Sequence, residues 1–224
     1  MYNLAPMLSG TLYTAGGALL LATPLGIASA LFIVFYAPLF AAQVYRRLVE
    51  LLAGIPSVVF GFWGLTTLVP LINQLHPPGA SLLAGILVLT LMILPTITLT
   101  AHAALLAVPT EYLRGAMALG LSRWGMISGV VLPAAKTGIV AGIMLAGGRA
   151  IGETMAVLMV TGNVPQHAGG LFDPIRTLTA NMALEMAYAM HDHRAALFVS
   201  GLALMLLIMA LSSIAGWLGK HYNA

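Results

Sequence analysis

The sequence predicts an all-α integral membrane protein with about five spanning helices. The chain has 224 residues, of which 60% are apolar and only 7% are charged, and its mean hydropathy is +1.00. A soluble domain carries about 25% charged residues, so water cannot cover this surface on all sides. The apolar stretches are continuous rather than alternating, which argues against a membrane β-barrel. Because the chain contains no cysteine, disulfide modules and thiolate metal sites are excluded as well.

Five apolar stretches are long enough to cross the bilayer, which requires about 20 residues of helix. They cover residues 11–36, 51–72, 81–108, 137–161 and 195–218. The first 30 residues lack the pattern of a cleaved signal, so we expect the first span to remain in the mature protein. The basic residues are spread thinly along the chain, which argues against a nucleic-acid partner. Membrane lipid is therefore the expected surrounding of this protein.

The distribution of cations predicts the orientation of the spans, because basic residues favour the inner side. An odd number of spans places the two termini on opposite sides. With the N-terminus outside, the inner side receives six cations and the outer side two: Arg46, Arg47, Arg114, Arg123, Lys136 and Lys220 against Arg176 and Arg194. We therefore expect the protein to lie in the cytoplasmic membrane, with the N-terminus on the outer side and the C-terminus on the cytoplasmic side.

Two connections are too long to be simple turns. The outer connection, residues 162–194, is expected to hold one short helix over 175–190 and to end in a solvated polar loop over 191–194. The inner connection, residues 109–136, is expected to form two short helices that meet near Gly120, with Leu132-Pro133 ending the second one before the fourth span. Three prolines are expected to kink the spans that contain them, namely Pro24, Pro56 and Pro95.

The inner connection resembles the coupling segment of ABC importer permeases, whose pattern is E-A-A, three residues, G, nine residues, I, any residue, L-P. The spacing is met at every place, although Arg114 stands where the pattern has glutamate. Gly115 and Ala116 take the two alanine places, and Gly120 is the glycine. Val130 stands for the isoleucine, and Leu132 and Pro133 close the pattern. The resemblance implies that residues 1–224 form one transmembrane domain of the type I ABC importer class, and that residues 109–135 dock on a cytoplasmic ATPase.

The residues of this segment also allow a physical interpretation. Its apolar side chains Met117, Trp124 and Ile127 are spaced to enter a groove on a partner protein. An ordinary interfacial helix, with its apolar side in the lipid headgroups, is the alternative. The match in spacing favours docking.

Arg149 and Glu153 are the two charged residues inside a predicted span. A charge at membrane depth costs about 2.5–3.5 kcal/mol even on the lenient insertion scale, so the pair requires an explanation. Their spacing of four predicts that both lie on one face of a single helix. One interpretation is a structural ion pair. The other is a water-filled path in which Arg149 attracts an anion and Glu153 orients it.

The sequence around this pair is similar to that of oxyanion ABC permeases. The pattern R-A-x-G-E is followed by Thr154-Met155-Ala156-Val157, and this continuation resembles the phosphate-specific (Pst) type, most closely its PstC subunit. Residues 52–62, 23–27 and 177–181 agree with the same type. Such permeases usually carry an additional span before the five-span core. The resemblance implies an importer of inorganic phosphate that works by alternating access. Other oxyanions, a phosphonate and an independent secondary transporter remain the alternatives.

The chain has no phosphate-binding loop for ATP, so we expect it to be a transport subunit that binds no cofactor. ATP and Mg²⁺ would be used by a partner ATPase. The resemblance implies a PstA-like second permease, two PstB-like ATPase subunits and an external PstS-like phosphate-binding protein.

Hydroxyl groups near the predicted spans have two possible uses. Ser57 either lines the path or caps a helix, and we carry it as a path residue together with Thr154. Thr96, Thr98 and Thr100 follow Pro95 and could line a polar path. We favour the alternative that their hydroxyls bond back to the preceding turn of the same helix.

Overall fold

The protein is described here by a computed structural model, which covers residues 4–221, with side chains described to residue 214. The described residues are almost entirely helical. Among them, Gly162 and Ile175 form an isolated parallel β-bridge. Five helical stretches are long and apolar enough to cross a membrane, which confirms the predicted class. Their bounds are Ala5–Tyr36, Ser57–Leu75, Leu82–Leu106, Arg123–Gly152 and His191–Ile214.

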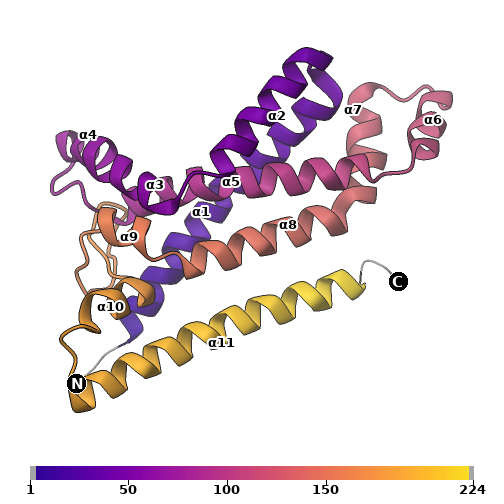
Figure 1. The fold of residues 1–224 in the computed structure, drawn as a ribbon. Coiled ribbons are helices and arrows are strands. Elements are labelled where there is room, and N and C mark those ends of the chain that lie inside the picture. Colours follow the sequence, from indigo (N-terminus) through magenta and orange to yellow (C-terminus); the bar gives the residue numbers. More distant parts are fainter. Residues whose placement is uncertain (1–3, 222–224) are drawn as a thin grey trace.

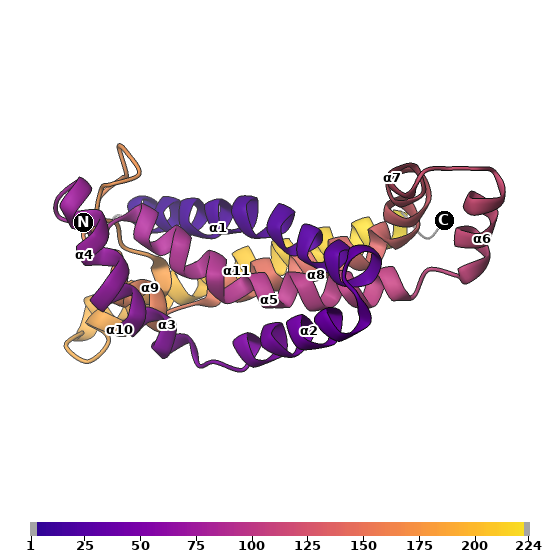
Figure 2. The same cartoon turned by 90° about the horizontal axis from the view of Figure 1, so that it is seen from above.

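The long helices run between two ends of the molecule (Figure 1). One end carries the short helices α6 and α7, and the other carries α4, α9 and α10, as the second view also shows (Figure 2). The long helices are α1 (Ala5–Leu31), which η1 (Phe32–Tyr36) continues, α5 (Leu82–Leu106), α8 (Leu132–Gly152) and α11 (His191–His221). We refer to the two ends as the α6–α7 end and the α4–α10 end.

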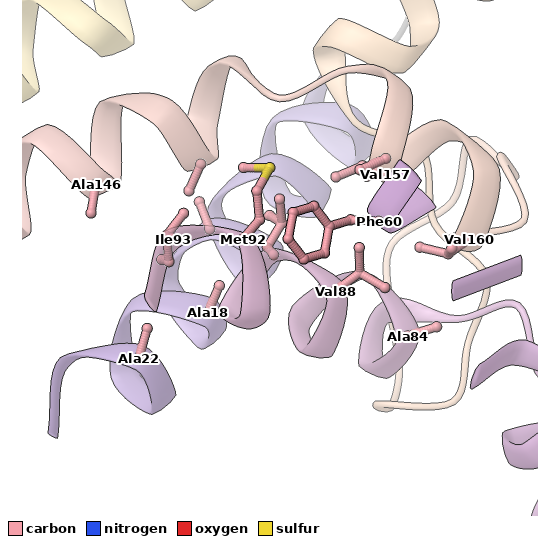
Figure 3. Close-up of a cluster of buried hydrophobic side chains, with 14 of the residues drawn as sticks. Ala18, Ala22, Phe60, Ala84, Val88, Met92, Ile93, Ala146, Val157 and Val160 are labelled. Carbon is pink, nitrogen blue, oxygen red and sulfur yellow. The ribbon is translucent and has the colours of Figure 1, made fainter. Parts of the chain in front are cut away.

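Helix α5 is the most buried of the spans, and it packs against α1 and α8. The main core cluster joins these three helices to the short ones beside them (Figure 3). Small side chains such as Ala18, Ala22 and Ala146 are fully buried there. They let the helix backbones approach closely, which is the usual basis of helix packing in a membrane, where apolar burial gives no driving force between helices.

The second span differs from its predicted bounds of 51–72. Helix α2 (Leu39–Ala53) occupies most of the segment between the first and second predicted spans and extends into the start of the second. The chain then turns at Gly54–Pro56, and α3 (Ser57–Trp63), η2 (Gly64–Leu68) and α4 (Val69–Leu75) follow. Pro56 is the N-cap of α3, so it separates two helices and does not kink one, because a proline lacks the N–H that a helix interior requires. Pro24 and Pro95 do lie inside helices.

The fourth span also departs from prediction, at both of its ends. Helix α7 (Arg123–Met126) continues through η3 (Ile127–Val131) into α8, so the prediction that Leu132-Pro133 ends a separate helix is wrong. Proline is tolerated in the first turn of α8, where its missing N–H costs little, and the π-type turn of η3 precedes it. At the other end, α8 stops at Gly152 and α9 (Met155–Val160) begins after a break.

The connection at the α4–α10 end holds a helix shorter than the predicted 175–190. Helix α10 (Leu178–Glu185) begins where Thr177, in an extended conformation, accepts a hydrogen bond from the N–H of Ala180. Residues 191–194 form the first turn of α11 instead of a solvated loop. His193 Nε2 lies 3.3 Å from a carboxylate oxygen of Glu185, whose other oxygen accepts a 2.9 Å bond from Arg176.

Two glycines bring α3 against α9. A Cβ added at Gly61 would lie 2.8 Å from Ala156 Cα, and one at Gly64 would lie 2.8 Å from Val160 Cγ1. These contacts advance in the same direction along both helices, so α3 and α9 lie side by side and run parallel. Ser57, one turn before Gly61, therefore lies about one turn before the level of Ala156, on the side of the break that precedes α9.

Replacing Gly61 by valine is expected to push α3 away from α9 and to lower stability by about 1–3 kcal/mol, because backbone atoms of Ala156 cannot yield as a flexible side chain does. The midpoint of thermal unfolding of the purified transporter measures this effect. Gly16→Val is the matched control, since it makes the same change inside α1, where a Cβ at Gly16 meets nothing within 4 Å. An unchanged midpoint for Gly61→Val would contradict the packing described here.

Candidate anion path and coupling surface

Arg149 lies near the end of α8, and its side chain is exposed in the single chain. It lies within the fourth span, Arg123–Gly152, and at the helical rise of 1.5 Å per residue it is about 20 Å further along α8 than Lys136. With Lys136 taken as the inner boundary of this span, that distance is less than the hydrocarbon thickness of about 30 Å. The guanidinium of Arg149 donates a 3.4 Å hydrogen bond from Nη1 to the hydroxyl of Thr96 on α5. The structure thus presents a cation at membrane depth on an open face of the chain.

Glu153 lies in the break between α8 and α9, with an extended backbone (φ −69°, ψ 130°). Its carboxylate accepts a 3.1 Å hydrogen bond from the N–H of Ala156, and its carbonyl accepts a 2.8 Å bond from the hydroxyl of Thr179. These contacts turn the side chain toward the start of α9. Glu153 therefore supports the break in the helix and stabilises the first turn of the helix that follows.

Of the two interpretations of Arg149 and Glu153, the structural ion pair is not formed. Glu153 is the C-cap residue of α8, and its carboxylate binds the N–H of Ala156 instead of the guanidinium. Among the residues that the structure describes, no ion pair within 4 Å joins Arg149 to Glu153; the pairs there involve Arg46 with Glu50, and Glu185 with Arg176 and His193. The structural ion pair is thus not formed, and the guanidinium is left to other partners.

The other predicted path residues lie near this break. Thr154 is in it, and its hydroxyl donates a 3.4 Å bond to the carbonyl of Gly152. Ser57 begins α3, where its hydroxyl makes no capping hydrogen bond, and the packing of α3 on α9 puts it close to the level of the break. Ser57 begins the second span and Gly152 ends the fourth, so the two candidate path residues Ser57 and Thr154 lie at or just beyond the ends of spanning helices.

The predicted coupling segment forms the α6–α7 end of the molecule (Figure 2). Helices α6 (Thr110–Ala118) and α7 meet at Gly120, as predicted, and Gly120 has a left-handed backbone with φ of +72°. The hydroxyl of Ser122 accepts a 3.1 Å bond from the N–H of Gly125, which caps α7. Apolar side chains near the turn are strongly exposed: Leu119 is 81% exposed, Trp124 63% and Met117 61%.

The remaining residues of the segment divide into two groups. Arg114 and Gly115 are exposed beside Gly120 and Trp124. Ala116 belongs to a second cluster of buried apolar residues, which we call the second core cluster. Val130 and Leu132 are partly buried and pack against this cluster. Ile127 is fully buried, so its predicted role as an exposed docking residue is wrong.

Two contacts were not predicted, one at the coupling segment and one at the candidate path. Arg123 donates a 3.3 Å hydrogen bond to the carbonyl of Phe35 and lies over the ring of Tyr36, so it ties α7 to the end of the first span. Thr96 contacts Arg149, although it was expected to bond within its own helix. The position of Thr96 directly after Pro95 signalled a polar role, but the partner helix could not be identified from spacing alone.

Comparison with known proteins defines the class. The family described as "Binding-protein-dependent transport system inner membrane component" matches residues 22–223. The chain belongs to this family, so it is a multi-pass membrane permease component and not itself an enzyme. A solved structure described as "Inward facing conformations of the MetNI methionine ABC transporter" superposes with a TM-score of 0.72 at 17% identity, covering 98% of this chain and 94% of that one. This likeness shows the fold, that of type I ABC importer transmembrane domains.

Curated relatives are more similar in sequence. The "Probable ABC transporter permease protein YqgH" of Bacillus subtilis is 40% identical over 93% of this chain and 68% of its own length. The "Phosphate transport system permease protein PstC" of Mesorhizobium japonicum is 36% identical over 99% of this chain and 74% of its own length. A protein of the same name from Xylella fastidiosa is 33% identical over 96% of this chain and 72% of its own length.

Proposed function

We propose that this chain is the PstC-type permease subunit of an ATP-driven importer of inorganic phosphate. The observation that carries the substrate class is Arg149, an exposed cation at membrane depth that has no carboxylate partner among the described residues. The names of the relatives at 33–36% identity over nearly the whole chain support phosphate in particular.

Exposure of Arg149 to lipid would be unfavourable, because a charged side chain at the bilayer centre costs about 2.5–3.5 kcal/mol even on the lenient scale. Water, an anion or a second permease must therefore cover it in the membrane. A planar guanidinium can bind two oxygens of a phosphate group in a bidentate manner, with charge-assisted hydrogen bonds. We assign Arg149, Glu153, Thr154 and Ser57 to the path, with Arg149 as the group that attracts the anion and Glu153 as the group that shapes the break.

The coupling role is assigned to residues 109–135. Arg114, Gly115, Gly120 and Trp124 would face an ATPase subunit, whereas Ala116, Val130, Leu132 and Pro133 would join the segment to the spans. The second core cluster supports this division, because it packs α6 against α5, η3 and α8. A movement of α6 and α7 would therefore be passed to α8, whose other end carries Arg149. Alternating access would follow from the ATP-driven opening and closing of the ATPase pair.

The charge distribution supports an orientation with the α6–α7 end and the C-terminus in the cytoplasm and the N-terminus outside. In this arrangement a PstA-like permease covers the open face, two PstB-like ATPases bind α6 and α7, and a PstS-like protein delivers phosphate at the α4–α10 end. ATP and Mg²⁺ would be bound by the ATPases, and no cofactor by this chain. The membrane is the inner membrane of a bacterium or archaeon.

Uptake of labelled phosphate by proteoliposomes that contain the complete transporter tests this function. The expected result is ATP-dependent accumulation that needs the phosphate-loaded binding protein and is competed by unlabelled phosphate much more strongly than by sulfate or molybdate. Preferential transport of sulfate, molybdate or a phosphonate would overturn the substrate assignment. Uptake without the ATPase would contradict the transporter class.

A further inference from the structure

Arg149 is held by a neighbouring helix and not by an acid. Within the described part of the chain, its one hydrogen bond joins Nη1 to the hydroxyl of Thr96, at 3.4 Å. The nearest acid in sequence, Glu153, uses its carboxylate to bind the N–H of Ala156. The direction of the guanidinium therefore depends on α5 rather than on its own helix.

The hydroxyl of Thr96 differs from those of the neighbouring threonines of α5. Thr90 donates a 2.7 Å bond to the carbonyl of Ile86, and Thr100 donates a 2.8 Å bond to the carbonyl of Thr96. Both bond back to their own helix, as threonines in membrane helices commonly do. Thr98 is fully buried, and its hydroxyl has no partner among the described residues. Thr96 is thus the threonine of this group whose hydroxyl contacts a cation on another helix.

The packing of α5 against α8 holds this contact in place. A Cβ at Gly142 would overlap the side chain of Thr100, and one at Gly138 would lie 2.6 Å from Ala104 Cβ, so the two backbones approach closely over about one turn. Beyond them, Ala146 and Ala150 of α8 are buried in the main core with Ile93 and Ile97 of α5. Thr96 therefore occupies a fixed position relative to the base of the Arg149 side chain.

We propose that Thr96 is a positioning residue for phosphate passage, because it orients the guanidinium of Arg149. This proposal rests on the function proposed above. The hydroxyl of Thr96 accepts a hydrogen bond from one edge of the Arg149 guanidinium and leaves the remaining N–H groups free to bind phosphate oxygens. A long, flexible arginine pays a large entropic cost when it is ordered by the anion alone. A partner that orders it beforehand lowers this cost at the step when phosphate enters the path.

The test uses the complete transporter in proteoliposomes, with labelled inorganic phosphate and increasing concentrations of the phosphate-loaded binding protein. Thr96→Val keeps the shape of the side chain and removes the hydroxyl. We expect its maximal uptake rate to fall roughly three- to tenfold, as for the loss of one ordinary hydrogen bond, because the contact with the guanidinium is long at 3.4 Å. The half-saturating concentration of binding protein should not change, because Thr96 lies away from the α4–α10 end. Thr96→Ser should restore most of the rate.

Thr90→Val is the matched control, since it makes the same change on the same helix at a hydroxyl that bonds to its own backbone. It should transport at the wild-type rate. A wild-type rate for Thr96→Val, an equal loss in Thr90→Val, or no rescue by Thr96→Ser would each overturn the positioning role. If Thr96→Val does not assemble, Thr96→Ala repeats the measurement.

The two proposals fail in different ways. If the wild-type transporter moves another oxyanion and not phosphate, the phosphate assignment fails. The ratio of Thr96→Val to wild-type rates for that oxyanion then decides the role of Thr96.

Discussion

Replacing Arg149 by glutamine is expected to abolish phosphate uptake while the transporter still assembles. Glutamine keeps a polar, unbranched side chain with an N–H donor at its end. It has no charge, however, and cannot form the bidentate, charge-assisted bonds that a guanidinium makes with phosphate. Each such bond contributes about 1.5–3 kcal/mol, so the loss of two corresponds to a decrease in rate of about a hundredfold or more. Uptake of labelled phosphate, normalised to the amount of assembled transporter, measures the effect.

Assembly should survive this change because Arg149 is exposed and makes one weak hydrogen bond to Thr96 within the described chain. Gln43→Ala is a suitable comparison, since Gln43 is an exposed polar residue of α2 and belongs neither to the path, nor to residues 109–135, nor to the α4–α10 end. It should leave the rate near that of the wild type. Normal uptake by a well-assembled Arg149→Gln transporter would contradict the anion path.

Replacing Gly120 by valine is expected to uncouple ATP hydrolysis from transport. With φ of +72°, Gly120 occupies a conformation that costs a β-branched residue about 1–2 kcal/mol or more. The turn between α6 and α7 would change to relieve this strain, and the surface around Trp124 and Leu119 would change with it. Transport-coupled ATPase activity should therefore fall roughly tenfold, as measured by phosphate release in the presence of loaded binding protein.

Gly16→Ala provides the contrast. Gly16 lies inside α1, outside residues 109–135, and a Cβ there meets nothing within 4 Å, so alanine should stabilise the helix and leave coupling intact. If Gly120→Val couples as well as Gly16→Ala does, the assignment of this segment as the ATPase docking surface is wrong.

The sequence predicted the number of spans and the turn at Gly120 correctly, because both follow from strong local signals. Continuous apolar stretches identify spans whatever their packing. A glycine placed between two short amphipathic stretches identifies a sharp turn. The bounds of the second and fourth spans were less accurate, because hydropathy does not distinguish a continuous helix from two helices that meet inside the membrane.

Of the two interpretations of Arg149 and Glu153, the ion pair is not formed because of the break between α8 and α9. The break is supported by the hydroxyl of Thr179, far along the chain, which binds the carbonyl of Glu153. Such support cannot be read from local spacing. A local signal was nevertheless present: Gly152 is a poor helix residue and Thr154 is a good N-cap. Together they could have indicated that Arg149 and Glu153 belong to different elements.

The central claim is that Arg149 faces an aqueous path through the membrane. The chain contains no cysteine, so Arg149→Cys introduces its only thiol. The most direct test is the rate at which a membrane-impermeant, negatively charged thiol reagent labels this cysteine in the assembled transporter. Leu20→Cys on α1 is the control, because Leu20 is 78% exposed in the single chain and would face either lipid or a partner helix, both of which exclude the reagent. The account predicts labelling of Arg149→Cys at least about tenfold faster than that of Leu20→Cys, since thiolates react only where water reaches them. Equal, slow labelling of the two positions would contradict it.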